Sequence, residues 1–366
     1  MTNSLFKNPF THDLSLQRYP VIKNNKLQAF DSADSLILKD CFKRDLSGKR
    51  ILIINDQFGA ISCALQKFNI TSYTDSYLSY AAILKNSKQE VTAINDLDKF
   101  QGIYDFILIK IPKNLSFFED ILSHLTHHMS QKTQCIFGGM IKHMPKGAFD
   151  LIEKIIGKTS TSLGEKKARL IYASFELPII QSKFPIFLNI QEWGPPLTNH
   201  SNLFSREKLD IGTRFFLQSI PTGNFDKILD LGCANGIIGL YAQLKNPSSQ
   251  IIYTDESAMA IKSAKENHRS QFNSKAIFHW THGYTEGPSN EIDLVLCNPP
   301  FHQGHTIENI IALQMFHDSY RALKKGGTLR IIGNSHLKYK ALLNKIFNLV
   351  QVIATNQKFI ILECQK

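Results

Sequence analysis

The short stretch CNPPF, residues 297–301, ends an apolar segment and combines groups that could hold a planar amine. Two consecutive prolines remove backbone donors and fix φ, so a central strand has to end there. The side-chain oxygen of Asn298 and a main-chain carbonyl fixed by Pro299 can both accept hydrogens from one amino group. Such acceptors hold the amine and turn its lone pair towards an electrophilic methyl group. Phe301 can stack on an attached base.

A turn rich in small residues, DLGCANG at 230–236, separates an apolar strand from a helix. Glycines at such a junction expose backbone N–H groups at the positive end of the helix and let a ligand approach closely. Asp255 comes 23 residues after Gly232, at the end of the next strand, where a carboxylate can accept hydrogen bonds from ribose hydroxyls. The spacing differs from the GxGxxG of dinucleotide enzymes. Together the two features indicate a ligand that contains adenosine.

Strands that alternate with helices have to position these groups. The pattern predicts strands at 227–232, 250–257, 276–280, 293–298, 328–334 and 358–364. It predicts helices from about 258 to 267 and from 307 to 325, the second ended by Gly326 and Gly327 as helix C-termini often are. Such alternation is typical of a mostly parallel, doubly wound α/β sheet.

The N-terminal half repeats this order in weakened form. KRILIINDQFGAISCAL is similar to KILDLGCANGIIGLYAQL, but its glycines are interrupted by Asn55, Asp56 and Phe58. SYTDSYLSYAAILKNS parallels IYTDESAMAIKSAKEN, and YDFILIKIPKN parallels IDLVLCNPPF with Lys110 in place of Asn298. Three landmarks in the same order indicate a duplicated domain. Two generic α/β segments with chance similarity are the alternative.

The net charge of +11 favours a polyanionic partner, because binding would release condensed counterions. Residues 1–185 carry 24 basic and 17 acidic side chains, a net charge of +7, and residues 186–366 carry a net +4. The half that has lost the small-residue turn therefore holds the larger excess of positive charge. This favours a binding role for it. The boundary is expected within 184–205, where connecting strands and a loop are predicted.

Composition places the chain among soluble globular proteins. It has 366 residues, 43% of them hydrophobic and 20% charged, which suits two domains of ordinary size. No stretch approaches about 20 apolar residues, and MTNSLFKNPF lacks a signal pattern, so we expect a cytoplasmic protein without a membrane partner. The six cysteines form no CxxC pair, and neither a disulfide framework nor a metal site is suggested.

DLGCANG, YTDES and CNPPF together resemble the glycine motif, the acidic second-strand position and the amine-binding motif of S-adenosylmethionine-dependent methyltransferases. NLFSREKLDIGTRFF and NPPFHQGH are similar to the ribosomal RNA guanine-N2 methyltransferases, and QRYP, LQAFDSAD, KKARL and IATNQKFIILE to the large-subunit members. The resemblance covers nearly the whole chain. It implies two tandem Rossmann-like class I methyltransferase domains, with a degenerate RNA-binding domain at 1–185 and a catalytic domain at 186–366.

The same resemblance implies where S-adenosylmethionine would bind. The glycine motif would line its methionine part through Gly232, Cys233 and Gly236, and Asp255 would hold its ribose. His282 would lie near the adenine, although a surface loop histidine is an equal alternative. A segment that contains Asp210, Gly212 and Thr213 would close over cofactor and substrate. The family has glycine where Ala234 stands, and its methyl group is tolerated there if φ is negative.

For the substrate, the resemblance implies that Asn298, Pro299 and Phe301 hold a guanine. The expected reaction methylates the 2-amino group of a guanine in 23S rRNA, naked or partly assembled, by a monomer that does not act on DNA. Rival activities are methylation of 16S rRNA, of adenine in DNA, or of glutamine in a protein. The rival from another class is a catalytically silent RNA-binding assembly factor, against which Asp255 and the NPPF motif argue.

Overall fold

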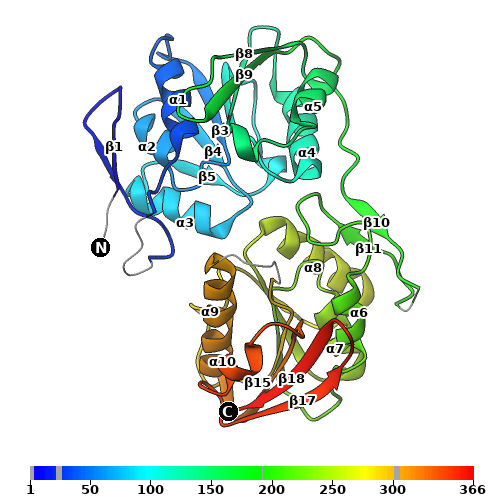
Figure 1. Ribbon diagram of the computed structural model, residues 1–366. Helices are drawn as coiled ribbons and strands as arrows, with labels where there is room; N and C mark the ends of the chain where they lie inside the picture. Colours follow the sequence, from blue (N-terminus) through cyan, green and yellow to red (C-terminus); the bar gives the residue numbers. More distant parts are fainter. Residues whose placement is uncertain (1–3, 22–26, 192, 301–305) are drawn as a thin grey trace. The chain divides into compact units, whose positions relative to one another are not determined.

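The computed structural model describes residues 4–21, 27–191, 193–300 and 306–366. The chain divides into two compact units, residues 1–184 and 185–366, and each unit contains its own seven-stranded sheet (Figure 1). All six cysteines are buried and unpaired. Among the described residues, no helix has the length and apolar character needed to cross a membrane.

The sheet of the C-terminal unit has the strand order β14-β13-β12-β15-β16-β18-β17. Its parallel strands are β12 (Lys227–Leu231), β13 (Gln250–Asp255), β14 (Ile277–Trp280), β15 (Ile292–Cys297) and β16 (Leu323–Asn334). It is completed by β17 (Leu349–Thr355) and β18 (Phe359–Gln365), with β18 antiparallel to both β16 and β17. The chain runs from β12 towards one edge and then returns to β15. Ligands of such sheets bind at this switch point, outside the carboxyl ends of the strands.

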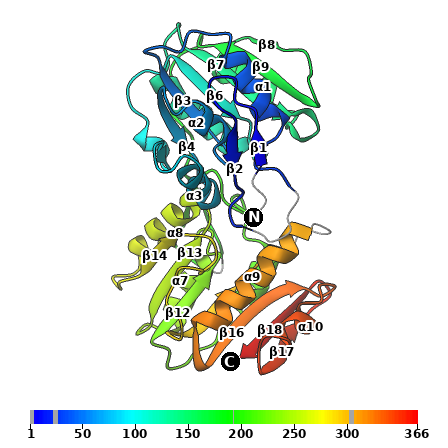
Figure 2. The ribbon, with the colours of Figure 1, turned by 90° about the vertical axis from the view of Figure 1, so that its left-hand side faces the viewer.

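Helices cover both faces of this sheet (Figure 2). One face packs on α6 (Ile211–Leu217), α7 (Ile237–Lys245) and α8 (Ala258–Gln271), and the other on α9 (Thr306–Ala322) and α10 (Tyr339–Leu343). Each face of the sheet has its own hydrophobic core, and successive residues of β12 belong to different ones. Ile228 lies in the core with Phe216 and Leu240, and Leu229 lies in the core with Phe316. Burial on both faces explains why these strands read as nearly continuous apolar runs.

The helix predicted at 307–325 ends earlier than expected. It ends at Ala322, because Leu323 already pairs with Ile292 as the first residue of β16. Gly326 and Gly327 therefore lie within a strand rather than after a helix, at a register shift between β15 and β16. Gly326 has a φ of +79°, which a residue with a side chain adopts only under strain. Strand pairing overrides the local helix signal here.

A short antiparallel pair, β10 (Ile186–Leu188) and β11 (Leu197–Asn199), precedes the seven-stranded sheet of the C-terminal unit. It lies in the segment where connecting strands were predicted. The loop after β11 leads to α6, which Asp210 caps: its carboxylate accepts the backbone N–H of Thr213 at 2.9 Å. Side-chain acceptors at this position stabilise a helix start by about 1 kcal/mol.

The N-terminal unit repeats the same strand order, β5-β4-β3-β6-β7-β9-β8. Its strands are β3 (Arg50–Ile54), β4 (Asn69–Tyr73), β5 (Thr92–Ile94), β6 (Phe106–Lys110), β7 (Gln134–Met140), β8 (Thr159–Thr161) and β9 (Ala168–Ser174). Its helices are α1 (Ser32–Cys41), α2 (Ala60–Ala64), α3 (Tyr77–Asn86), α4 (Leu115–Leu125) and α5 (Ala148–Ile155), and a hairpin of β1 (Ser4–Phe6) and β2 (Leu14–Leu16) precedes them. The position-by-position match confirms the predicted tandem fold.

Candidate active site

Three neighbouring parallel strands bring the predicted chemical groups to one edge of the C-terminal sheet. Gly232 follows β12, Asp255 ends β13, and Asn298 follows β15. The strands are in register here, since Leu231 lies opposite both Thr254 and Cys297. The turn is tied to β13 because the backbone N–H of Gly232 donates to the carbonyl of Thr254 at 2.9 Å.

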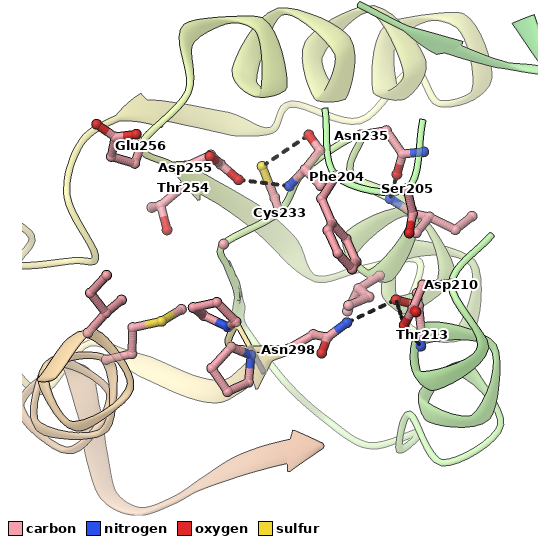
Figure 3. Close-up of a pocket in the computed structure, with 18 of the residues that line it drawn as sticks. Phe204, Ser205, Asp210, Thr213, Cys233, Asn235, Thr254, Asp255, Glu256 and Asn298 are labelled. Carbon is pink, nitrogen blue, oxygen red and sulfur yellow. Dashed lines mark hydrogen bonds between the residues drawn. The ribbon is translucent and has the colours of Figure 1, made fainter. Parts of the chain in front are cut away.

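A cavity of about 550 Å³ opens at this edge, a size suited to a cofactor-sized ligand (Figure 3). Most of the residues predicted from the sequence line it, namely Asp210, Thr213, Gly232, Cys233, Asp255, His282, Asn298 and Pro299. They come from α6, from three strand ends and from the segment after β14. The fold therefore joins side chains that are up to 89 positions apart in the sequence.

Two of the predicted residues are not part of this described lining. Gly236, with a φ of +86°, is the N-cap of α7 and is not among the residues that line the cavity, although its neighbours Asn235 and Ile237 are. A Cβ atom there would lie 3.0 Å from the Cβ of Ala264, so this glycine lets α7 start close to α8. Phe301 lies outside the described residues.

Two residues of the glycine turn, Gly232 and Ala234, have a positive φ, and the alanine is strained there. Gly232 has a φ of +78°, where a Cβ atom would lie 3.2 Å from Cε of Met315. Ala234 also has a positive φ, +48°, so the negative φ that would make its methyl group harmless is not adopted. An alanine in this region costs about 1–2 kcal/mol. The backbone N–H of Ala234 donates to Asp255 Oδ2 at 2.9 Å, which helps to hold the turn.

Asp255 is anchored by backbone groups on both sides. Besides the bond from Ala234, its Oδ1 accepts the N–H of Ser257 at 2.9 Å. A carboxylate offers about four lone-pair sites, so the two oxygens retain capacity for ribose hydroxyls. The side chain lines the cavity with a fixed orientation (Figure 3). This geometry fits the ribose of S-adenosylmethionine.

Electrostatics also fit a cofactor that carries a sulfonium cation. The described lining contains the carboxylates of Asp210, Asp255 and Glu256 but no lysine or arginine. Burial, together with nearby Asp255, raises the pKa of the Cys233 thiol, so it stays neutral. Burial lowers the pKa of His282, which keeps its imidazole uncharged at neutral pH. The excess of negative groups attracts a cation.

Among the described residues, the amide of Asn298 has a hydrogen-bond partner at its nitrogen but not at its oxygen. Its Nδ2 donates to Thr213 Oγ1 at 2.9 Å, and the Thr213 hydroxyl lies 3.4 Å from Asp210 Oδ2 (Figure 3). The Oδ1 atom of Asn298 is buried, and no donor in the described part of the chain reaches it. A buried carbonyl oxygen without a donor is costly, and an incoming N–H would satisfy it.

Sequence reasoning missed Phe204, which lies in the loop between β11 and α6. Its ring lines the cavity and remains 58% exposed. Figure 3 shows it pointing inward, towards the space between the glycine turn and Asn298. The signal was present, since Phe204 lies in the family-like segment NLFSREKLDIGTRFF, but only the fold aims this ring at the cavity.

The corresponding edge of the N-terminal sheet is filled by the unit's own side chains. Asp56, at the position of Cys233, is 1% exposed and accepts the backbone N–H groups of Gly59 at 3.1 Å and Ser62 at 2.7 Å. Lys110, at the position of Asn298, forms ion pairs with Asp31 at 2.8 Å and Asp34 at 2.6 Å. Asp56 therefore accepts two N–H groups around the start of α2, whereas Cys233 stands at this position in the other copy and Asp230 accepts the N–H of Gly239 at 2.8 Å.

The fold and this site define a Rossmann-like class I methyltransferase, and comparison with known proteins agrees. Residues 4–177 match the model of the RLMG N-terminal domain, and residues 195–363 match that of the methyltransferase small domain. A T. thermophilus structure, a 16S rRNA N2 G1207 methyltransferase in complex with AdoMet and guanosine, covers 100% of this chain and 98% of its own at a TM-score of 0.80. At 16% identity, that likeness is one of fold.

Closer relatives are ribosomal RNA large subunit methyltransferase G proteins. The protein of Psychromonas ingrahamii is 40% identical, over 96% of this chain and 97% of its own length. That of Pseudomonas aeruginosa strain PAO1 is 39% identical, over 99% of this chain and 100% of its own length. The chain belongs to the ribosomal RNA large subunit methyltransferase G family, which confirms the resemblance inferred from its sequence. It is a methyltransferase with S-adenosylmethionine as its cofactor.

Proposed function

We propose that the C-terminal unit methylates the 2-amino group of a guanine in 23S rRNA. The observation that carries this proposal is the buried Oδ1 of Asn298, a side chain that lines the cavity, because this oxygen has no donor among the described residues. A planar amine is the ligand that such an acceptor fits. The names of the relatives support large-subunit rRNA as the substrate, and the T. thermophilus neighbour, named for N2 and crystallised with guanosine, supports the 2-amino group of guanine.

Different residues of the cavity would bind the two ligands, S-adenosylmethionine and guanine. Asp255 takes the ribose hydroxyls, with Gly232 and Cys233 under the methionine part and His282 towards the adenine. When bound, S-adenosylmethionine supplies an electrophilic methyl group.

Asn298 Oδ1 and the main-chain carbonyl of Pro299 accept the two N–H groups of the guanine amine. This directs the lone pair of the amine along the line of attack, so catalysis is by positioning. No base is required at Asn298, because the methylated amine loses its proton readily to water.

The target base has to leave its stack to enter. A paired guanine has its 2-amino group engaged, so an unpaired or flipped guanine is the reactive form. Phe204 offers it an aromatic face, and base–aromatic stacking contributes about 1–3 kcal/mol. Naked or partly assembled rRNA suits this requirement. We further infer that the protein acts as a monomer in the cytoplasm, on RNA and not on DNA.

The N-terminal unit, residues 1–185 in our division of the chain, would grip the RNA. Its net charge of +7 and its filled former cofactor edge support a binding role without chemistry. RNA affinity of the full chain should fall with salt, with a log–log slope of about −0.7 per phosphate contacted on single strands. Reversal of several exposed lysines of this unit should make the slope shallower. An unchanged slope would assign the RNA contacts to the C-terminal unit.

The function is tested by mapping N2-methylguanine in 23S and 16S rRNA from cells with and without the protein, and in transcripts treated with purified enzyme. Asn298→Ala should lower turnover by about 10²- to 10³-fold while cofactor affinity stays unchanged, because one aligned acceptor is lost at the reacting centre. Methylation confined to 16S rRNA would support that rival substrate. If N2-methylguanine in both 23S and 16S rRNA is the same in cells with and without the protein, a catalytically silent assembly factor would be favoured.

A further inference from the structure

The amide of Asn298 has two ends of similar size but opposite chemistry. Only the oxygen can accept an N–H from the guanine amine, whereas the NH₂ end would repel it. Rotation by 180° about the last side-chain bond exchanges the two ends with almost no change in shape. Catalysis through Asn298 therefore requires a neighbour that distinguishes them.

Thr213 and Asp210 form a chain of hydrogen bonds with a defined direction. A carboxylate can only accept, so the hydroxyl of Thr213 directs its proton to Asp210 Oδ2, 3.4 Å away. The lone pairs of Thr213 Oγ1 are then left for a donor, and only the Nδ2 end of Asn298 can supply one, at 2.9 Å. The oxygen end consequently points away from Thr213, in a side chain that lines the cavity (Figure 3).

Asp210 is itself fixed, because its Oδ2 also accepts the backbone N–H of Thr213 at 2.9 Å as the cap of α6. Thr213 is only 6% exposed, which limits its rotation. The direction of the hydrogen bonds is therefore set by the start of a helix rather than by a mobile side chain.

The N-terminal unit contains the same contact with different residues. Asp31 caps α1 as Asp210 caps α6, and Asp34 stands three residues later, as Thr213 does. Lys110 at the end of β6 donates to both, at 2.8 and 2.6 Å. In each copy the side chain at the strand end donates to the first turn of this helix. Lysine has no acceptor, so only the C-terminal copy retains an atom for the substrate amine.

We propose that Thr213, held by Asp210, is a positioning residue that fixes the amide of Asn298 with its oxygen towards the substrate, rather than a ligand of the cofactor. The inference rests on the proposed function, because it assigns the amine to Asn298 Oδ1. It gives Thr213 a role different from the cofactor contact that the family resemblance implies.

The first test compares Thr213→Val, which keeps the shape and removes the hydroxyl, with Thr213→Ser, which keeps the hydroxyl. Thr213→Val should lower kcat by about tenfold, since a typical hydrogen bond biases the two amide orientations by that factor. The Kd for S-adenosylmethionine should stay within about twofold of wild type, and Thr213→Ser should restore most of kcat. A weakened cofactor affinity with unchanged kcat would overturn the inference.

The second test makes amide direction irrelevant. In Asn298→Asp either oxygen can accept, so adding Thr213→Val should lower kcat no further than Asn298→Asp does alone. A tenfold loss in both backgrounds would show that Thr213 acts independently of the amide, and would refute its positioning role. Double-mutant cycles of this kind isolate the pairwise effect.

The third test reads binding rather than turnover. With saturating S-adenosylhomocysteine, wild type should prefer guanosine to inosine, which lacks the 2-amino group, and Thr213→Val should reduce this preference. An undiminished preference in the variant would count against the inference.

If wild-type protein forms no N2-methylguanine in rRNA, the proposed function fails and the inference with it. If wild type methylates and Thr213→Val is equally active, only the inference fails.

Discussion

Replacement of Asp255 provides the sharpest test of the cofactor site. Asp255→Ala removes a charged acceptor for the ribose hydroxyls, an interaction of about 1.5–3 kcal/mol. The Kd for S-adenosylmethionine should therefore rise by about 10- to 150-fold. Asp255→Asn keeps one neutral acceptor oxygen and should raise Kd by about tenfold.

The structure adds a second effect that has to be separated. Asp255 also accepts the backbone N–H groups of Ala234 and Ser257, so its loss loosens the glycine turn. Asp293 is a matched control: its Oδ2 accepts the N–H groups of Asp226 at 2.9 Å and Lys227 at 2.8 Å, at the opposite end of β15. Asp293→Ala should lower thermal stability comparably and leave cofactor affinity unchanged.

Isothermal titration calorimetry with each variant, alongside thermal unfolding, distinguishes the two effects. Wild-type affinity in Asp255→Ala would place the ribose elsewhere and refute the assignment. An equal rise in Kd for Asp293→Ala would show that the change follows from lost stability rather than from a lost ribose contact.

Three further predictions concern the strained and buried groups. Ala234→Gly should raise the unfolding free energy by about 1 kcal/mol, measured in denaturant, because glycine adopts a φ of +48° without strain; a loss of stability would contradict this. Lys110→Met should destabilise the N-terminal unit by about 3–5 kcal/mol, since it leaves Asp34 buried without its cation, and hydrogen exchange confined to that unit would reveal it. Burial raises the pKa of Asp230 to about 7, so the stability from its protonated form is complete below about pH 4 and is lost as the pH rises through 7. Asp230→Asn should gain thermal stability relative to wild type between pH 5 and 8, and a constant difference would refute the shift.

Several features followed from local sequence alone. Apolar runs that end at Gly232, Asp255 and Asn298 predicted parallel strands whose carboxyl ends meet, and the sheet places all three on one cavity. Two prolines after Asn298 marked the end of β15, because they cannot continue a central strand. The duplication could be recognised from the sequence because both copies have the same three features in the same order: a strand–turn–helix segment, an acidic residue after the next strand, and the end of a third apolar strand. Such signals depend on residue type and short spacing.

Other features required contacts between distant segments. The helix signal before Gly326 was overridden because Leu323 pairs with Ile292, and β17 (Leu349–Thr355), absent from the predicted strands, exists as an edge strand through its pairing with β18. The positive φ of Ala234 is not encoded by alanine, which prefers negative φ. It is set by the turn between β12 and α7 and by the bond to Asp255.

The sequence by itself determined the fold class, the family and eight of the residues that line the cavity, because strand periodicity, turn chemistry and motif spacing are local properties. Only the tertiary structure decided how those residues are used. It showed that Gly236 allows close packing of α7 on α8 and that the ring of Phe204 points into the cavity. It also showed that the orientation of the Asn298 amide is set by a hydrogen bond to Thr213, 85 positions away in the sequence. Direction of a hydrogen bond depends on what lies on both sides of an atom, and that is known only once the chain has folded.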